Sequence, residues 1–254
     1  MHVDNPISQK IDRLGICVIV PTYNNHKTLA GVINGILQYT NHIIVVNDGS
    51  ANETAGILAN YNDIRVISFS QNRGKGIALR EGFKTALELG FQYAITIDSD
   101  GQHNPGDIPL FVEKLDAEGE SLIIGVRNME QESVPGKSNF GRKFSNFWFN
   151  VETGIKHDDT QSGFRLYPLK PIAQTKLFTS KFELEIELIV RLAWKGAEIK
   201  SVPVTVKYFP KDERVSHFRP AIDFTRISIL NTVLVTLAFL YFRPMLFFSK
   251  KKTR

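Results

Sequence analysis

Apolar runs alternate along this chain with polar loops and with segments of helical periodicity. Five short runs are rich in apolar residues, at 16–20, 42–46, 64–69, 93–97 and 122–126. Apolar residues recur with helical spacing at 28–37, 53–61, 74–89 and 107–115. Continuous apolar runs are typical of strands buried on both faces, and strands that alternate with helices form βαβ units. The pattern predicts an α/β fold with a mainly parallel, Rossmann-like sheet flanked by helices.

The second half of the chain is less regular. Segment 135–150 mixes cationic and aromatic residues, which is typical of an amphipathic core helix or of a helix that lies on a membrane and admits a lipid. A helix is expected at 182–193, where Glu183, Glu185 and Glu187 cannot all share one face. We expect one of these glutamates near the site and the others in solvent.

The C-terminal part is apolar and ends in a basic tail. Residues 227–242 carry no charge, and at about 1.5 Å per residue they span roughly 24 Å, less than the roughly 30 Å of a hydrocarbon core. Residues 250–254 contain four Lys or Arg residues, which favour anionic lipid on the cytoplasmic side. We expect a membrane-associated helical segment at the cytoplasmic face, either peripheral or a single span.

Polar residues follow each predicted strand, and the carboxyl ends of parallel strands meet at one edge of the sheet. The turn 98–102 (Asp-Ser-Asp-Gly-Gln) offers carboxylate and amide oxygens, the ligands that Mg²⁺ or Mn²⁺ prefers together with substrate phosphates. An isolated Asp-x-Asp is more often a solvated turn, but here several polar clusters converge. An EF-hand is excluded, because Pro109 stands where its last glutamate belongs.

Two other clusters are expected at the same edge. Asp48, before Gly49 and Ser50, fits either a plain turn or a hydrogen bond to a base or ribose. Gly74 and Lys75 open a helix, whose free N–H groups and lysine suit a phosphate. The spacings of a P-loop and of a dinucleotide-binding Gly-x-Gly-x-x-Gly are absent, which disfavours kinases and dinucleotide enzymes.

These motifs resemble those of family 2 glycosyltransferases with the GT-A fold. The resemblance rests on the order of 21–25 (PTYNN), 46–50 (VNDGS), 72–76 (NRGKG) and 98–103 (DSDGQH). A second set of motifs resembles one branch of this family, the enzymes that are similar to dolichol-phosphate mannosyltransferase and act on polyprenol phosphates. These motifs lie at 125–127, 141–142 and 159–165 (DTQSGFR). The resemblance covers 15–210, so we expect an N-terminal extension at 1–14, a GT-A domain at 15–210, and a basic loop with the membrane-associated segment at 211–254.

The resemblance implies a role for each motif residue, together with Mg²⁺ or Mn²⁺ as cofactor. The metal would be held by Asp98, Asp100 and Gln102. The residues expected at the nucleotide-sugar donor are Pro21, Tyr23, Asn25, Asp48, Gly74, Lys75, Asp98 and Ser99. Those expected at the acceptor or its phosphate are Arg142, Ser162, Arg165, Arg214 and His217, and those expected in catalysis are Asp100, Asp159 and Arg127. Asn25 and Asn47 stand where the family often has acidic residues, so the base recognised stays open.

Composition agrees with an enzyme of this class. The chain has 254 residues, 43% apolar and 22% charged, as in globular proteins, and a formal charge of +5 that favours anionic partners. The lone Cys17 lies in a predicted strand, and no secretory signal is visible. We expect a nucleotide-diphosphate sugar, a lipid-linked phosphate acceptor and a membrane surface as partners, and no nucleic acid.

The expected reaction transfers a sugar from a nucleotide diphosphate with inversion, as the family implies. A lipid phosphate is already an anion near pH 7, whereas an alcohol acceptor needs a base, for which Asp159 is a candidate. The arginines at 127, 142, 165 and 214 favour the phosphate acceptor. The alternatives are a family 2 enzyme acting on a hydroxyl of a glycan or glycolipid, and a sugar-nucleotide-binding protein without turnover.

Overall fold

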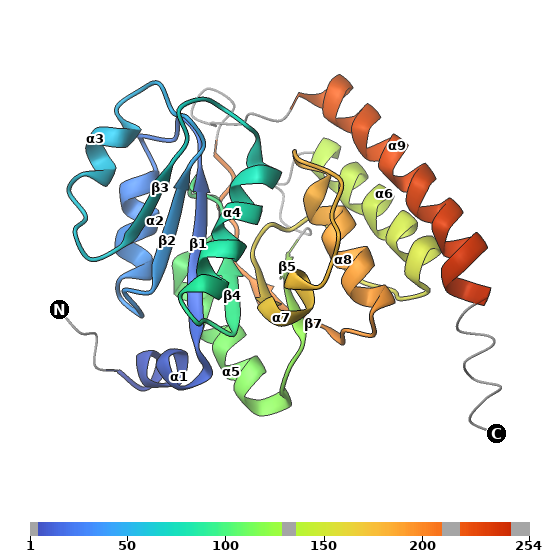
Figure 1. Ribbon diagram of the computed structural model, residues 1–254, viewed down its shortest axis with the longest axis horizontal. Coiled ribbons are helices and arrows are strands. Elements are labelled where there is room, and N and C mark those ends of the chain that lie inside the picture. The colour runs from blue at the N-terminus through green and yellow to red at the C-terminus, as the bar shows by residue number, and fades with distance from the viewer. Residues whose placement is uncertain (1–4, 129–135, 210–218, 245–254) are drawn as a thin grey trace.

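A single mixed sheet forms the centre of the protein. The computed structural model describes residues 5–128, 136–209 and 219–244, and within them seven strands pair in the order β3-β2-β1-β4-β6-β5-β7 (Figure 1). Only β6 runs antiparallel to its neighbours β4 and β5. The strands are β1 (Ile16–Thr22), β2 (Ile43–Asn47), β3 (Arg65–Ser68), β4 (Tyr93–Thr96), β5 (Leu122–Arg127), β6 (Arg165–Pro168) and β7 (Ile199–Val204). The predicted mainly parallel α/β fold is confirmed.

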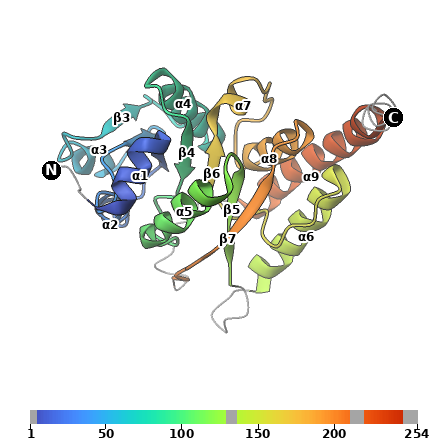
Figure 2. The same ribbon diagram turned by 90° about the horizontal axis from the view of Figure 1, so that it is seen from below.

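Helices cover both faces of this sheet (Figure 2). One face packs on α1 (Pro6–Leu14), α2 (Leu29–Ile36), α3 (Thr54–Leu58) and α5 (Ile108–Glu118). The other packs on α4 (Lys75–Glu88), α7 (Leu169–Ala173), α8 (Leu184–Trp194), α6 (Gly136–Thr153) and α9 (Pro220–Leu237). Two short elements, η1 (Pro105–Asp107) and the π-helical η2 (Ala238–Phe242), precede α5 and extend α9.

Strand β1 shows why continuous apolar runs predicted this arrangement. Cys17 and Ile19 belong to the core on the α4 side, whereas Ile16 and Val18 belong to the core on the α2 side. All four are 0% exposed. Successive side chains of a strand point to opposite faces, so both faces must be apolar when helices cover both.

Three elements differ from the expectation. The N-terminal residues form α1, begun by a capping box between Asn5 and Ser8 and joined to α5 by the Lys10–Glu113 ion pair at 2.6 Å. Strand β6, which was not predicted, inserts between β4 and β5. At 199–208 the sequence favours one or two strands with a bend at Pro203, but β7 continues through this proline, because it lies at the edge of the sheet, where a missing N–H costs no ladder bond.

The prediction that two of the glutamates near α8 are solvated is wrong. Glu183, Glu185 and Glu187 are 7%, 9% and 0% exposed. Glu187 is covered by the preceding loop, whose backbone N–H groups at Phe178 and Thr179 donate to its carboxylate.

A buried carboxyl group lies where α6 meets α8. Glu152 is 0% exposed, and neither carboxyl oxygen has a hydrogen-bond partner among the described residues. Its backbone carbonyl accepts the indole N–H of Trp194 on α8 at 2.9 Å. Burial disfavours the charged form and raises the pKa of Glu152 to about 8, so the group is protonated at neutral pH in the folded protein.

This carboxyl group predicts a loss of stability as the pH rises. The unfolded chain releases the proton near its ordinary pKa of about 4.3, whereas the folded chain holds it up to about pH 8. Between these values the folded state binds more protons, so the free energy of unfolding falls with rising pH. From pH 5 to pH 8 we expect wild type to lose about 3 kcal/mol more than Glu152→Gln, measured by urea unfolding at each pH. Parallel pH profiles of the two proteins would contradict this assignment.

Candidate active site

A cavity of about 450 Å³ lies at the carboxyl ends of β1, β2 and β4. The polar clusters that follow these strands converge on it, as the topology of a parallel sheet requires. The sequence-predicted residues that line it are Pro21, Tyr23, Asn25, Asp48, Gly74, Lys75, Asp98, Ser99 and Asp100.

The two aspartates of the turn after β4 have different surroundings. Asp98 is paired at 2.7 Å with the ammonium of Lys75, which also lies 2.8 Å from Glu185. Burial alone would raise the pKa of Asp98, but Lys75 outweighs it and holds that pKa below its ordinary value. Asp100 is half-buried, and its Oδ1 accepts the backbone N–H of Gln102 at 3.0 Å. Gly101, which lies between Asp100 and Gln102, has φ 72°, a left-handed conformation that favours glycine.

The cavity fits a divalent cation that shares its coordination shell with a substrate. Besides the two carboxylates, Thr22 Oγ1 and Asn25 Oδ1 are buried polar atoms of the cavity wall with no hydrogen-bond partner among the described residues. Within the same residues, no cluster of three or more His, Cys, Asp or Glu side chains could hold a metal alone. Mg²⁺ is usually bound by one or two carboxylates plus phosphate oxygens. Gln102 is not among the cavity-lining residues, and its ligand role stays a prediction.

Asp48 organises the loop that leads into α4. Its oxygens accept the backbone N–H groups of Arg73 and Gly74, both at 2.7 Å, and the side-chain amide of Asn72 at 3.0 Å. The carboxylate is 3% exposed and reaches the cavity wall. Its observed role is therefore to hold the loop against the end of β2, while contact with a base or ribose stays a prediction.

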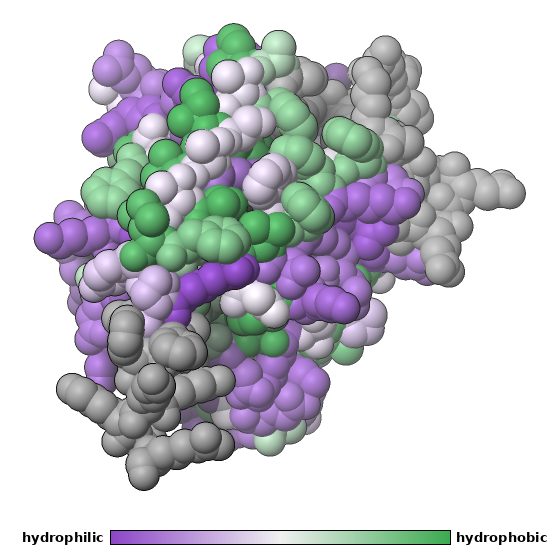
Figure 3. Space-filling model, turned by 90° about the vertical axis from the view of Figure 1, so that its right-hand side faces the viewer, coloured by the Kyte–Doolittle hydropathy of each residue, from purple (hydrophilic) through white to green (hydrophobic). Residues whose placement is uncertain are grey.

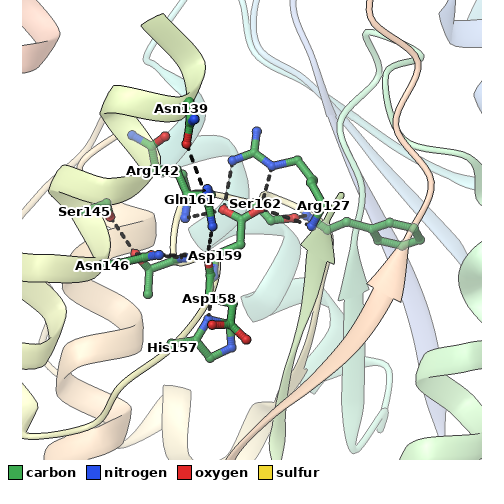
Figure 4. A network of polar contacts seen from close by, with 12 residues as sticks. Arg127, Asn139, Arg142, Ser145, Asn146, His157, Asp158, Asp159, Gln161 and Ser162 are labelled. Atoms are coloured by element: carbon green, nitrogen blue, oxygen red, sulfur yellow. Dashed lines mark hydrogen bonds and ion pairs between the residues drawn. The ribbon is translucent and has the colours of Figure 1, made fainter. Parts of the chain in front are cut away.

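A second polar network lies on the loop that precedes β6 (Figure 4). Arg127 and Asp159 form a bidentate pair, with Nε–Oδ2 at 2.6 Å and Nη2–Oδ1 at 2.9 Å. The side chains are 12% and 0% exposed. Burial opposes the charge on Asp159, but the guanidinium outweighs it and lowers the pKa of the carboxyl group. A carboxylate held this way has little affinity for a proton.

Helix α6 fixes this loop from the other side. Arg142 donates to the carbonyl of Asp158 at 2.8 Å, and Asn146 donates to the same carbonyl at 2.7 Å. Thr160 donates its hydroxyl to Ser145 at 2.7 Å. Figure 4 shows these α6 side chains pointing toward the loop.

Not every predicted acceptor residue can face a ligand. Arg165 is 1% exposed and donates to the carbonyls of Thr160 and Glu185, at 2.9 and 2.8 Å. Because its guanidinium is buried among these partners, the prediction that it contacts an acceptor phosphate is wrong. Ser162 is 0% exposed, and its acceptor role stays a prediction. Arg214 and His217 lie outside the described residues.

Gly163 joins the second network to the cavity. A Cβ at this position would lie 2.8 Å from Asp98 Oδ2 and 3.2 Å from Lys75 Nζ, so the backbone at Gly163 passes directly against this ion pair. Thr96 of β4 donates its hydroxyl to the Gly163 carbonyl at 2.8 Å. The loop with Arg127 and Asp159 is thereby held directly beside the carboxylate expected to bind metal.

Four residues from the second half of the chain also line the cavity, and among them only Arg219 was a candidate, as part of a basic loop that could bind a phosphate. They are Lys181 and Phe182 before α8, and Arg219 and Asp223 at the start of α9. Asp223 is 2% exposed and accepts the backbone N–H of Arg219 at 2.7 Å. No motif marks Lys181, Phe182 or Asp223 as site residues, because only tertiary packing brings the starts of α8 and α9 to the carboxyl edge of the sheet.

The sheet order and the carboxylate turn beside a cavity define a class, the glycosyltransferases with the GT-A fold. The family model described as glycosyl transferase family 2 matches residues 17–172, more than half of the chain. The chain therefore belongs to glycosyl transferase family 2. The enzyme class and the GT-A fold predicted from the sequence motifs are confirmed.

Curated relatives share most of the chain. The UDP-N-acetylglucosamine–dolichyl-phosphate N-acetylglucosaminyltransferase of Methanococcus voltae is 28% identical over 76% of this chain and 86% of its own. The polyprenol monophosphomannose synthase of Mycolicibacterium smegmatis is 27% identical over 74% of this chain and 76% of its own. These names agree with the branch that the motifs of 125–165 resemble.

The fold is also similar to a solved structure. The crystal structure of glucosyl-3-phosphoglycerate synthase from Mycobacterium tuberculosis in complex with Mn²⁺, UDP and glucosyl-3-phosphoglycerate superposes with a TM-score of 0.67. The alignment covers 91% of this chain and 82% of that one, at 20% identity. At this identity the likeness concerns the fold.

Proposed function

We propose that this protein transfers a sugar from a nucleotide-diphosphate donor to a polyprenyl phosphate at a membrane surface, with inversion and with Mg²⁺ or Mn²⁺ as cofactor. The observation that carries the proposal is the position of α9. This helix contributes Arg219 and Asp223 to the cavity wall and then presents an apolar surface to the outside. The donor cavity thus opens beside the surface from which a lipid phosphate would arrive.

The apolar surface is formed by α9, η2 and α6. The described side chains that are at least 48% exposed there are Ile222, Ile229, Val233, Phe239, Leu240 and Tyr241 from α9 and η2, and Phe140 and Phe147 from α6. Figure 3, which faces the side of the molecule carrying these helices, shows a broad hydrophobic area. Contiguous apolar area of this kind marks an interaction surface for a membrane or a protein.

The helix formed by Ala221–Phe242 is long and apolar enough to cross a membrane by length and composition. It also packs on α6 near both ends, through Phe224 against Phe144 at 4.8 Å and through Arg243 donating to the Val151 carbonyl at 2.7 Å. Since α6 carries the polar network of Figure 4, it cannot enter a hydrocarbon core with α9. We propose that α9 lies in the interface, on the cytoplasmic face, with its outer side in lipid.

In the proposed reaction, the phosphate oxygen of the acceptor attacks the anomeric carbon while the bond to the nucleotide diphosphate breaks. A divalent cation bound to Asp98 and Asp100 would neutralise charge on the leaving diphosphate. The acceptor phosphate is already anionic near pH 7 and needs no protein base. The Arg127–Asp159 pair supports this choice, because the guanidinium leaves Asp159 a weak base.

The deciding experiment measures release of nucleoside diphosphate from a panel of sugar nucleotides, with polyprenyl phosphate present or absent. We expect release from one donor that depends on the lipid phosphate. Release that requires a glycan or glycolipid hydroxyl instead would favour the second candidate, a family 2 enzyme of polysaccharide or glycolipid synthesis. Donor binding without release would favour a non-catalytic sugar-nucleotide-binding protein.

Membrane binding is expected to depend on the outer face of α9. Ile229 and Leu240 are 61% and 76% exposed, so replacing both with glutamate leaves the core intact. Each apolar side chain moved from water into lipid contributes about 1.5–3 kcal/mol. We expect the double variant to bind anionic vesicles at least about tenfold more weakly in a flotation assay. Leu110→Glu on α5, which is 40% exposed on another face, is the control. Equal flotation of the double variant and wild type would locate the anchor elsewhere.

A further inference from the structure

The lysine of the glycine-rich turn is not free to neutralise a donor diphosphate. Lys75 Nζ lies between the carboxylates of Asp98 and Glu185, at 2.7 and 2.8 Å, and its side chain is 16% exposed. Its charge is already matched by two anions. The cations left to meet a diphosphate in the cavity are the divalent metal ion and the two other basic residues of the cavity wall, Lys181 and Arg219.

Lys181 provides such a cation at the start of α4. A Cβ at position 74 would overlap Cδ of Lys181 and lie 2.8 Å from its Nζ, so the lysine side chain lies directly over Gly74. Gly74 is the residue that precedes the first turn of α4, where backbone N–H groups have no partner within the helix itself. Lys181 lines the cavity, is half-buried, and has no hydrogen-bond or ion-pair partner within 5–128, 136–209 and 219–244.

The segment that carries Lys181 is fixed against α4. The backbone N–H of Ile77 donates to the Ser180 carbonyl at 3.1 Å. A Cβ at position 76 would lie 2.6 Å from the Lys181 carbonyl oxygen, so this close approach requires glycine. Arg80 of α4 also donates to the carbonyl of Leu177.

Glu187 holds the same segment from α8. Its fully buried carboxylate accepts the N–H of Phe178 at 3.0 Å and both the N–H and the hydroxyl of Thr179, at 2.9 and 2.8 Å. Arg191 balances the charge at 2.7 Å. A buried carboxylate with this many partners fixes a loop geometry.

We propose that Lys181 binds the diphosphate of the sugar-nucleotide donor, and that Glu187 is the positioning residue that places it. This inference rests on the proposed function and names the cation of that site. The proposal also explains why positions 74 and 76 are both glycine. Gly74 makes room for the side chain of Lys181, and Gly76 makes room for the backbone of residues 180 and 181. Lys75 instead fixes the carboxylate of Asp98.

The test measures binding of UDP and GDP with Mg²⁺ present, and of uridine and guanosine as ligands without phosphate, by calorimetry on the full chain. For the diphosphate that wild type binds more tightly, Lys181→Met should raise Kd by about tenfold to a hundredfold, the usual effect of losing a charge-assisted hydrogen bond. Binding of the matching nucleoside should be unchanged. Lys181→Arg should recover most of the affinity for the diphosphate. Glu187→Gln should also weaken diphosphate binding while leaving nucleoside binding intact.

Lys176→Met is the matched control, because it removes the same charge from an exposed position of the same segment that does not line the cavity. Lys181→Gln serves as a second variant, and thermal unfolding confirms that each variant is folded. Equal diphosphate affinity of Lys181→Met and wild type would overturn the role of Lys181 alone. Equal loss of diphosphate and nucleoside binding would overturn it as well. Failure of wild type to bind either diphosphate would overturn the proposed function together with this inference.

Discussion

Replacing Asp100 with asparagine is expected to lower turnover by at least about a thousandfold while leaving the fold intact. Asp100 is half-buried, and an asparagine keeps the oxygen that accepts the N–H of Gln102, so the turn is retained. What is lost is a negative ligand for the cation, whose stabilisation of the leaving diphosphate amounts to several kcal/mol, and about 4 kcal/mol corresponds to a thousandfold in rate. The measurement is nucleoside-diphosphate release under saturating donor and acceptor.

Asp63→Asn is the control for Asp100→Asn, since it makes the same charge change at an exposed position outside the cavity. It should retain the wild-type rate. Chelation of the wild type with EDTA should abolish release, and added Mg²⁺ or Mn²⁺ should restore it. A wild-type rate that is unchanged by EDTA would refute metal dependence, whatever the variant does.

Strands β1, β2, β4 and β5 could be predicted because burial on both faces requires continuous apolar residues. Strand β6 could not, because it contains Arg165, a residue type that is rarely buried. Its guanidinium is tolerated in the core only because loop carbonyls of residues 160 and 162 and the Glu185 carbonyl surround it. The start of α1 was predictable in principle from Asn5, Pro6 and Ser8, which together form a helix cap.

In the active site, too, some features could be predicted from the sequence and others could not. Motif residues at strand ends converge because parallel strands end at one edge, so Asp48, Asp98 and Asp100 could be placed near each other from sequence. The hydrogen-bond and ion-pair partners of these carboxylates could not be predicted. That Lys75 pairs with Asp98 and Glu185, and that Lys181 covers Gly74, depends on how α8 packs on α4. Spacing along the chain carries no information about such contacts.

Asp159→Asn is expected to destabilise the protein strongly and to leave the pH dependence of the reaction unchanged. The change leaves the guanidinium of Arg127, only 12% exposed, without its anion. Breaking a buried pair in this way typically costs 3–5 kcal/mol, about a third or more of the stability of a domain. Chemical unfolding measures this loss. Arg127→Met combined with Asp159→Asn should recover part of it, because no unpaired charge then remains buried.

Kinetics of the folded fraction of Asp159→Asn then separate the two acceptor classes. With a phosphate acceptor, the acid limb of the pH–rate profile belongs to the acceptor itself, near about pH 6, and should persist in the variant. With a hydroxyl acceptor, Asp159 would be the base, and the rate should fall by about 10²–10⁴-fold with loss of the acid limb. The guanidinium of Arg127 holds the pKa of Asp159 below its ordinary range, where a carboxylate is a poor base at neutral pH. We therefore expect the acid limb to persist, and its disappearance together with unchanged nucleotide affinity would establish a hydroxyl acceptor instead.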